Sequence, residues 1–203
     1  MSIQAHHRDR ARIIAQHEIG HLVISKCMGF TTGGVSVKLI GFDGHQGGAE
    51  IMLEEPFISV QQVKSYLERR AIVLFAGAVS ETLPPAHGPV RGVNKEKASE
   101  LIHGQTALSD YGKAREAIAM LRNILHPETV EIGEASDQKH QIIDRLWDRS
   151  VELVGQFETT IVGVAGALVE RLKPLDRERY EAVMTVEELD RIPALLAIPL
   201  LRP

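Results

Sequence analysis

The feature that most constrains this chain is the pentapeptide HEIGH, which begins at His17 inside the apolar run IAQHEIGHLVIS. Apolar residues recur at helical spacing from Ala5 to about Met28 and predict one long helix that contains the pentapeptide. Positions i and i+4 lie one turn apart on one face of a helix, so His17 and His21 can direct ring nitrogens at a single ion. Glu18 is turned by about 100° from His17 and lies beside such an ion without binding it.

This pattern is typical of catalytic zinc sites, in which two histidines and a third protein ligand leave one position open for water, and a glutamate accepts a proton from that water. The alternative is a helix whose histidines only line a core or a surface, since the chain has 9 histidines and the pattern can arise by chance. No histidine occurs in LVISKCMGF, directly after His21, so a third ligand must come from a distant part of the chain. We expect Cys27, in the same helix, to be a core residue rather than a ligand.

Composition excludes several classes of protein. A net charge of -4 and a pI near 6.1 disfavour nucleic-acid binding. One cysteine rules out an intramolecular disulfide framework. The start of the sequence lacks the apolar core of a secretory leader, and the longest low-charge runs, 71–79 and 159–169, are shorter than the roughly 20 residues that cross a bilayer. We therefore expect a cytoplasmic protein with no membrane span and no nucleic-acid partner.

Helical and strand patterns predict a mainly α (α+β) fold with one small sheet or hairpin after the first helix. The segments 34–41 and 49–53 read as strands, joined by turn residues at 42–48. Residues 131–203 read as a bundle of helices, and residues 84–104, rich in Gly and Pro, are the least regular part of the chain.

The further helices are predicted from apolar spacing and from residues that favour helix starts. Capping boxes at Ser59 with Gln62 and at Thr185 with Glu188 begin two of them, and Ser109 is the expected N-cap of another. The predicted spans are 59–83, a short helix from Asn94, 109–125, 136–172 with a break near Gly155, and a short helix from Thr185.

Several motifs, in the same order along the chain, resemble the FtsH family of zinc metalloproteases. AQHEIGHLV (15–23) is similar to the family's zinc-binding signature. AIVLFAGAVSETL (71–83) is similar to its helix with an Ala-Gly pair followed by an acidic residue, and TALSDYGKAREAIAML (106–121) resembles the segment that presents an aspartate at a helix start. Residues 142–172 are similar to its C-terminal helices. The resemblance implies one zincin-type peptidase domain over 1–203, with a zinc-binding catalytic part (1–130) and a C-terminal helical part (131–203).

The resemblance also implies that Asp110 is the third zinc ligand, a role that a carboxylate can fill. The alternative is an aspartate that only stabilises a helix start. Glu81 matches the family's acidic position, where a carboxylate could accept the free ring N–H of a zinc-bound histidine and fix its tautomer. The alternative for Glu81 is a surface residue near a helix end. The turn before Asp110 departs from the family, since Thr106-Ala107 and Ser109 stand where Gly-Ala and Asn are usual.

The expected activity is that of a zinc metalloendopeptidase that cleaves unfolded or flexible polypeptides with Glu18 as the base. No GxxxxGK[ST] loop occurs, so we expect no need for ATP. The family's ring assemblies are compatible with a homo-oligomer, or with a separate ATPase partner that delivers substrate. Two alternatives remain: an inactive pseudoprotease that binds peptides or a partner, and a metal-free helical interaction domain.

Two further predictions concern how a peptide would be held. Segment 34–41 is either a sheet edge that accepts a substrate strand or an ordinary strand within the sheet. The side chains that could stabilise a developing oxyanion are Tyr111, His45, His87 and His103, although residue type alone favours a surface or structural role for each of them.

Overall fold

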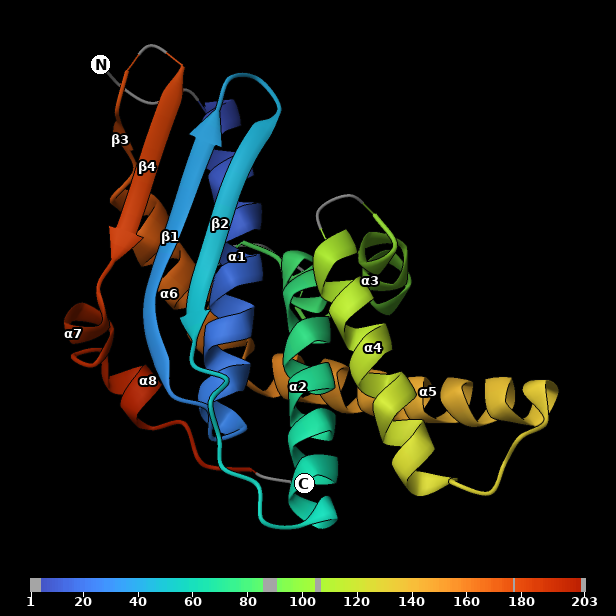
Figure 1. Ribbon diagram of the computed structural model, residues 1–203. Helices are drawn as coiled ribbons and strands as arrows, with labels where there is room; N and C mark the ends of the chain where they lie inside the picture. Colours follow the sequence, from blue (N-terminus) through green and yellow to red (C-terminus); the bar gives the residue numbers. More distant parts are fainter. Residues whose placement is uncertain (1–4, 86–90, 105–106, 177, 202–203) are drawn as a thin grey trace.

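A computed structural model describes residues 5–85, 91–104, 107–176 and 178–201. Its described part contains eight helices and one four-stranded antiparallel sheet (Figure 1), which confirms the predicted mainly helical α+β fold. The elements are α1 (Ala5–Cys27), β1 (Thr32–Ile40), β2 (Gly44–Ile51), α2 (Val60–Glu81), α3 (Lys95–Ile102), α4 (Leu108–Leu125), α5 (Ile132–Gln156), α6 (Glu158–Glu170), β3 (Lys173–Pro174), β4 (Arg179–Met184), α7 (Val186–Leu189) and α8 (Pro193–Leu196).

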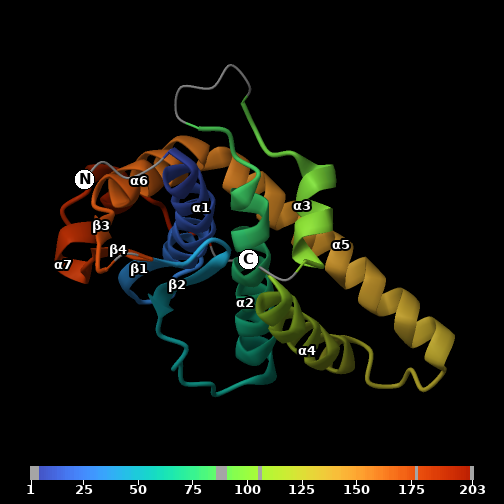
Figure 2. The same ribbon diagram turned by 90° about the horizontal axis from the view of Figure 1, so that it is seen from above.

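Helix α1 is the centre of the fold. The sheet covers one side of it, α2 runs beside it, and α6 packs against a further side (Figures 1 and 2). From Ile14 to its end the helix has little exposed surface, and Ile19, Leu22 and Val23 are fully buried. The apolar residues on both sides of the pentapeptide are therefore explained by burial on several faces, and the two histidines lie inside the protein rather than on its surface.

The sheet has the strand order β2-β1-β4-β3, so β1 lies between two neighbours. Val37 of β1 is opposite Gly47 of β2 on one side and Ala182 of β4 on the other. Val35 and Val37 are buried, which places this face of β1 in the core. Of the two interpretations of segment 34–41, the ordinary internal strand is correct, because β1 has no free edge. The outer strand on the α2 side is β2.

The structure corrects several boundaries of the predicted elements. Strand β2 begins at Gly44, so the Gly-rich stretch predicted as a turn is mostly strand, and the reversal takes place around Gly41, whose φ is 55°. Pairing with β1 overrides the low strand propensity of those glycines. The N-cap of α4 is Ala107, with no side-chain cap, and Ser109 lies within the helix. The prediction that residues 131–203 form only a bundle of helices is wrong, because strands β3 and β4 of this part pair into the sheet beside β1. Helix α8 was not predicted from the sequence either.

The helical span predicted at 136–172 consists of two helices, α5 and α6, separated at Phe157, which confirms the break predicted near Gly155. The hydroxyl of Ser150 on α5 donates to the carbonyl of Ile72 at 3.1 Å and ties α5 to α2. Among the described residues, no single helix is long and apolar enough to cross a membrane; α5 and α6 taken together pass such a test by length and composition, with a bend of 69° between them.

Candidate metal centre

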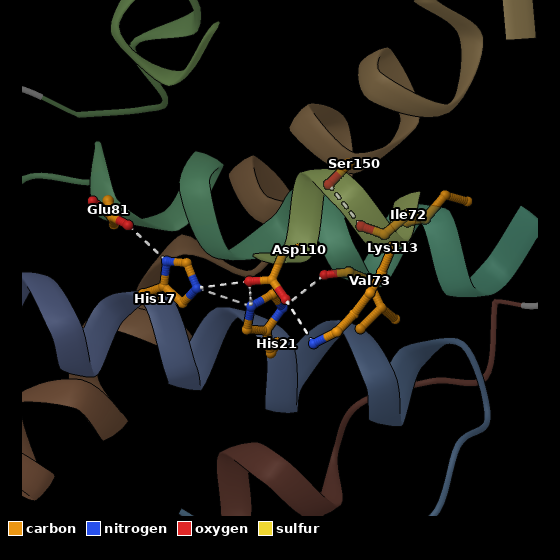
Figure 3. Close-up of polar contacts among 8 residues, drawn as sticks. All are labelled: His17, His21, Ile72, Val73, Glu81, Asp110, Lys113 and Ser150. Carbon is orange, nitrogen blue, oxygen red and sulfur yellow. Dashed lines mark hydrogen bonds and ion pairs between the residues drawn. The ribbon is translucent and has the colours of Figure 1, made fainter. Parts of the chain in front are cut away.

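Three ligand atoms from two distant parts of the chain meet between α1, α2 and α4. The Nε2 atoms of His17 and His21 are 3.0 Å apart, and Oδ2 of Asp110 is 3.2 Å from the first and 3.1 Å from the second. Figure 3 shows both rings rising from α1 toward the carboxylate, which comes from the first turn of α4. The two rings are buried, with 6% and 7% of their residue surface exposed. The structure thus brings together the three residues predicted as ligands.

The other ring nitrogens fix how the two imidazoles are protonated. Nδ1 of His21 is 2.8 Å from the backbone carbonyl of Val73, which can only accept, so Nδ1 carries a proton and donates it. Nδ1 of His17 is 2.6 Å from Oε1 of Glu81, a carboxylate that likewise accepts. Glu81 is 7% exposed, so the interpretation of this residue as a surface glutamate is wrong. Both histidines are therefore held with Nε2, the atom that binds metals in this tautomer, facing the centre of the group.

The charges at the centre are strongly coupled. Burial lowers the pKa of His17, but hydrogen bonds to Asp110 and Glu81 and the nearby carboxylate charges outweigh burial and raise that pKa to about 10. Burial raises the pKa of Asp110, yet its close polar contacts with the ring nitrogens of His17 and His21 outweigh burial and hold that pKa well below its usual range. The group therefore favours one positive charge between the rings and the carboxylate, and without a metal a proton on His17 supplies it.

The spacing of these atoms suits a metal ion. Bonds of about 2.0–2.2 Å to three corners of a tetrahedron keep the three donor atoms roughly 3.3 Å apart. The observed separations of 3.0, 3.2 and 3.1 Å are close to that value. The group could therefore hold a metal ion at three corners, with the fourth corner left for another ligand. Cys27, fully buried in the hydrophobic core, is not among these ligands, as expected.

Two glycines let the helices approach closely enough to build this group. A Cβ atom on Gly77 of α2 would lie 2.5 Å from Nε2 of His21 and 2.6 Å from Nε2 of His17. A Cβ atom on Gly20 of α1 would lie 2.6 Å from Cβ of Ser80 and 2.9 Å from the carbonyl oxygen of Ala76. Since Cβ atoms essentially never approach other atoms so closely, glycine is required at both positions.

The three ligands line a cleft of about 400 Å³ that also contains Glu18. Residues of β2 line the cleft together with residues of α1, α2 and α4. The carboxylate of Glu18 faces Gly47 of β2, where an added Cβ would lie 2.3 Å from its Oε1. Glu18 is half-buried and is not one of the three ligands. The predicted base therefore lies in the same cleft as the ligands and is free to interact with a molecule that enters it.

Several residues of this cleft were not predicted from the sequence. Arg70 of α2 and Lys113 of α4 line it, and Nζ of Lys113 is 3.9 Å from Oδ1 of Asp110, the oxygen that faces away from the rings. A signal for Arg70 was present, because Leu74, Gly77 and Glu81 follow Arg70 by four, seven and eleven positions, so that all four residues share one face of a helix. Neither Gly47 nor Lys113 had a comparable signal in the sequence.

The four candidate oxyanion donors have different places in the structure. His45 of β2 lines the cleft. The rings of Tyr111 and His103 pack on each other, with centroids 4.6 Å apart, and neither residue lines the cleft. His87 lies outside the described residues. Of the described candidates, His45 is therefore the one that a molecule in the cleft could contact.

These observations define a mainly helical α+β protein with a buried His-His-Asp group that could hold a metal ion, open to a cleft that contains a glutamate. In comparisons with known proteins, no family model matches the chain, and no curated protein matches it significantly. The likeness to the FtsH family therefore remains a prediction that depends on the motifs themselves.

Proposed function

We propose that this protein is a zinc metallopeptidase, similar to the protease part of the FtsH family, that hydrolyses peptide bonds in unfolded or flexible polypeptides. The observation that carries the proposal is the convergence of three metal-binding atoms beside Glu18 in one cleft. In the two tautomers fixed by Val73 and Glu81, two nitrogen lone pairs and a carboxylate oxygen face one another. Such an arrangement needs a cation among the three atoms. Without a metal this cation is the proton on His17, and a metal ion that replaces the proton could bind all three atoms, which supports a metal-binding role.

His17, His21 and Asp110 would hold the ion. Two imidazole nitrogens and one carboxylate oxygen are a donor set that zinc accepts readily in catalytic sites. When bound, zinc supplies acidity to a water molecule and polarises a carbonyl group. Glu81 and the carbonyl of Val73 keep the rings in the binding tautomer and orientation, which supports metal affinity.

Glu18 has the position of a general base in this proposal. Its carboxylate lies in the cleft next to the ligands and can take a proton from the attacking water. Glu18 then returns that proton to the nitrogen of the scissile amide, so that the C–N bond breaks and an amine leaves. Gly47 leaves room for this carboxylate beneath β2.

The shape of the cleft supports an extended polypeptide as substrate. Strand β2 is the outer strand of the sheet on this side and forms one wall of the cleft. An extended peptide can pair with such an outer strand through backbone hydrogen bonds and place one of its peptide bonds beside the ligands. A folded protein does not offer a free strand, so unfolded chains should be the better substrates. Hydrolysis uses only water and the residues named, so we propose that cleavage needs no ATP.

The test combines metal content with cleavage of unfolded casein. Glu18→Gln should retain about one zinc per chain and lose cleavage, because the amide cannot accept the proton. Glu116→Gln, an exposed change of the same kind on α4 outside the cleft, should keep both properties. Equal cleavage by Glu18→Gln and the wild type would refute Glu18 as the base. Zinc binding without any cleavage by the wild type would instead support the alternative of a peptide-binding pseudoprotease.

A further inference from the structure

Arg70 is the charged residue of the cleft whose role the proposed peptidase activity does not explain. The other charged side chains of the cleft, apart from Glu18, have partners: Glu81 bonds to His17, and Asp110 contacts both rings and Lys113. Arg70 makes no hydrogen bond or ion pair with any residue that the structure describes. It is half-buried, so its guanidinium has lost part of its hydration without gaining a hydrogen bond or an ion pair in exchange.

The position of Arg70 relative to the ligands follows from α2. Arg70, Leu74, Gly77 and Glu81 form one stripe along the helix, and all but Gly77 line the cleft while Gly77 touches both ligand rings. With a rise of about 1.5 Å per residue, the backbone of Arg70 lies roughly 10 Å along the helix from Gly77. An extended peptide advances about 3.3 Å per residue, so this separation corresponds to about three substrate residues.

A second cation lies on the same side of the ligands. In Figure 3 the ammonium of Lys113 lies on the His21 side of Asp110, whereas Glu81 lies beyond His17 at the opposite side. Arg70 precedes Val73, the partner of His21, on α2 and so lies on the His21 side as well. Burial lowers the pKa of Arg70, while the charges of Tyr66 and Asp110 raise it, and an arginine stays charged at neutral pH. The cleft is therefore positive at the His21 end.

We propose that Arg70, together with Lys113, binds a carboxylate of the substrate about three residues from the bond that is cleaved, and so selects acidic peptides. A carboxylate matches the planar guanidinium and can accept two parallel hydrogen bonds from it. The carboxylate belongs either to an internal Asp or Glu side chain or to the end of a peptide chain. This inference depends on the proposed peptidase function, because it names the kind of substrate that the same cleft takes.

The test measures peptide binding and cleavage separately. Zinc-loaded Glu18→Gln is titrated with labelled eight-residue peptides that are capped at both ends and differ only in one Glu or Gln. We expect the Glu peptide to bind about tenfold more tightly when the Glu is correctly placed, the size of effect expected from a charged hydrogen bond near solvent. A third peptide, with Gln and a free C-terminal carboxylate, shows whether the carboxylate is internal or terminal. Mass spectrometry of the products from the wild type then locates the cleaved bond relative to the Glu.

Variants assign the preference to Arg70. In the Glu18→Gln background, Arg70→Gln should bind the Glu and Gln peptides with about equal affinity. Arg70→Glu should instead prefer a further peptide that carries Lys at the same position. Arg115→Gln removes an exposed arginine on α4 outside the cleft and should keep the tenfold preference. Circular dichroism confirms that each variant is folded.

The outcomes separate this inference from the proposed function. If the peptides bind and are cleaved, but the Glu peptide is not preferred over the Gln peptide or the preference survives in Arg70→Gln, the inference about Arg70 is overturned and the proposed peptidase function is not. Peptides that neither bind nor are cut by the zinc-loaded protein overturn the peptidase function and the inference with it. A preference that Arg70→Glu reverses supports both.

Discussion

Gly77→Ala should abolish tight metal binding while the protein stays folded. The added methyl group would lie 2.5 Å from Nε2 of His21 and 2.6 Å from Nε2 of His17, where ordinary contact begins near 3.4 Å. Each ring must therefore retreat by roughly 0.8–0.9 Å, several times the tolerance of about 0.2 Å for metal–ligand distances. We expect zinc affinity to fall by at least about 100-fold, which corresponds to roughly 2.7 kcal/mol.

The effect on folding should be smaller. Replacing a glycine inside a helix by alanine stabilises the helix by about 1 kcal/mol, whereas overpacking a well-packed site costs about 1–3 kcal/mol. The net effect is a loss of at most about 2 kcal/mol, so the metal-free variant should still unfold in one cooperative thermal transition, at a somewhat lower temperature. Loss of metal binding can then be separated from loss of structure.

The assay is competition for zinc with a chromophoric chelator, accompanied by thermal unfolding of the metal-free protein. Gly163→Ala is the matched control, because a Cβ atom at this helical position in α6 meets nothing within 4 Å. It should retain zinc affinity and gain up to about 1 kcal/mol of stability. Gly77→Ala with zinc affinity close to that of the wild type would refute the close approach of α2 to the two rings.

Three other predictions test neighbouring parts of the site. Glu81→Gln should weaken zinc affinity about tenfold because a charged partner of His17 is lost, and unchanged affinity in chelator competition would assign Glu81 a purely structural role. The pKa of His17 is raised to about 10, so Nε2 of His17 still holds a proton at neutral pH and must release it when zinc binds. Calorimetry at pH 8 in buffers of different ionisation enthalpy should therefore count about one proton released per zinc. Zinc binding should also tighten as the pH rises toward 10. A count near zero would indicate a histidine with an ordinary pKa. Gly47→Ala should retain zinc but lower the rate of peptide cleavage about tenfold, since its methyl group would lie 2.3 Å from Oε1 of Glu18. In the control Gly48→Ala the methyl group meets nothing within 4 Å, so the cleavage rate should fall less. Equal cleavage rates in the two variants would contradict the proposed crowding of Glu18.

Local patterns predicted the parts of the site that depend on local geometry. The spacing of His17 and His21 on one helix face was sufficient to place both ring nitrogens together, because an α-helix determines the relation between positions four apart. The N-cap at Ser59 was also predicted from residues close together in the sequence, and its hydroxyl accepts a hydrogen bond from the backbone N–H of Gln62. Here the physical cause lies within a few residues of the pattern.

Contacts between distant parts of the chain could not be predicted in that way. Asp110 meets His21 across 89 positions, and only the resemblance to a family, not any spacing, suggested that contact. Strand β4 pairs with β1 from the far end of the chain, and its short sequence RYEAVM has no strong strand signal alone. The Gly-rich residues of β2 were read as a turn because their strand conformation depends on pairing with β1, and Gly47 is the residue that faces Glu18.

The central claim is that His17, His21 and Asp110 together bind one metal ion, and metal content measures it most directly. Purified wild-type protein, saturated with zinc and freed of excess by gel filtration, should retain about one zinc per chain by elemental analysis. Asp110→Ala, treated identically, should retain much less, because two neutral imidazoles alone bind zinc weakly. Equal zinc content in the two proteins, or none in the wild type, would contradict the account.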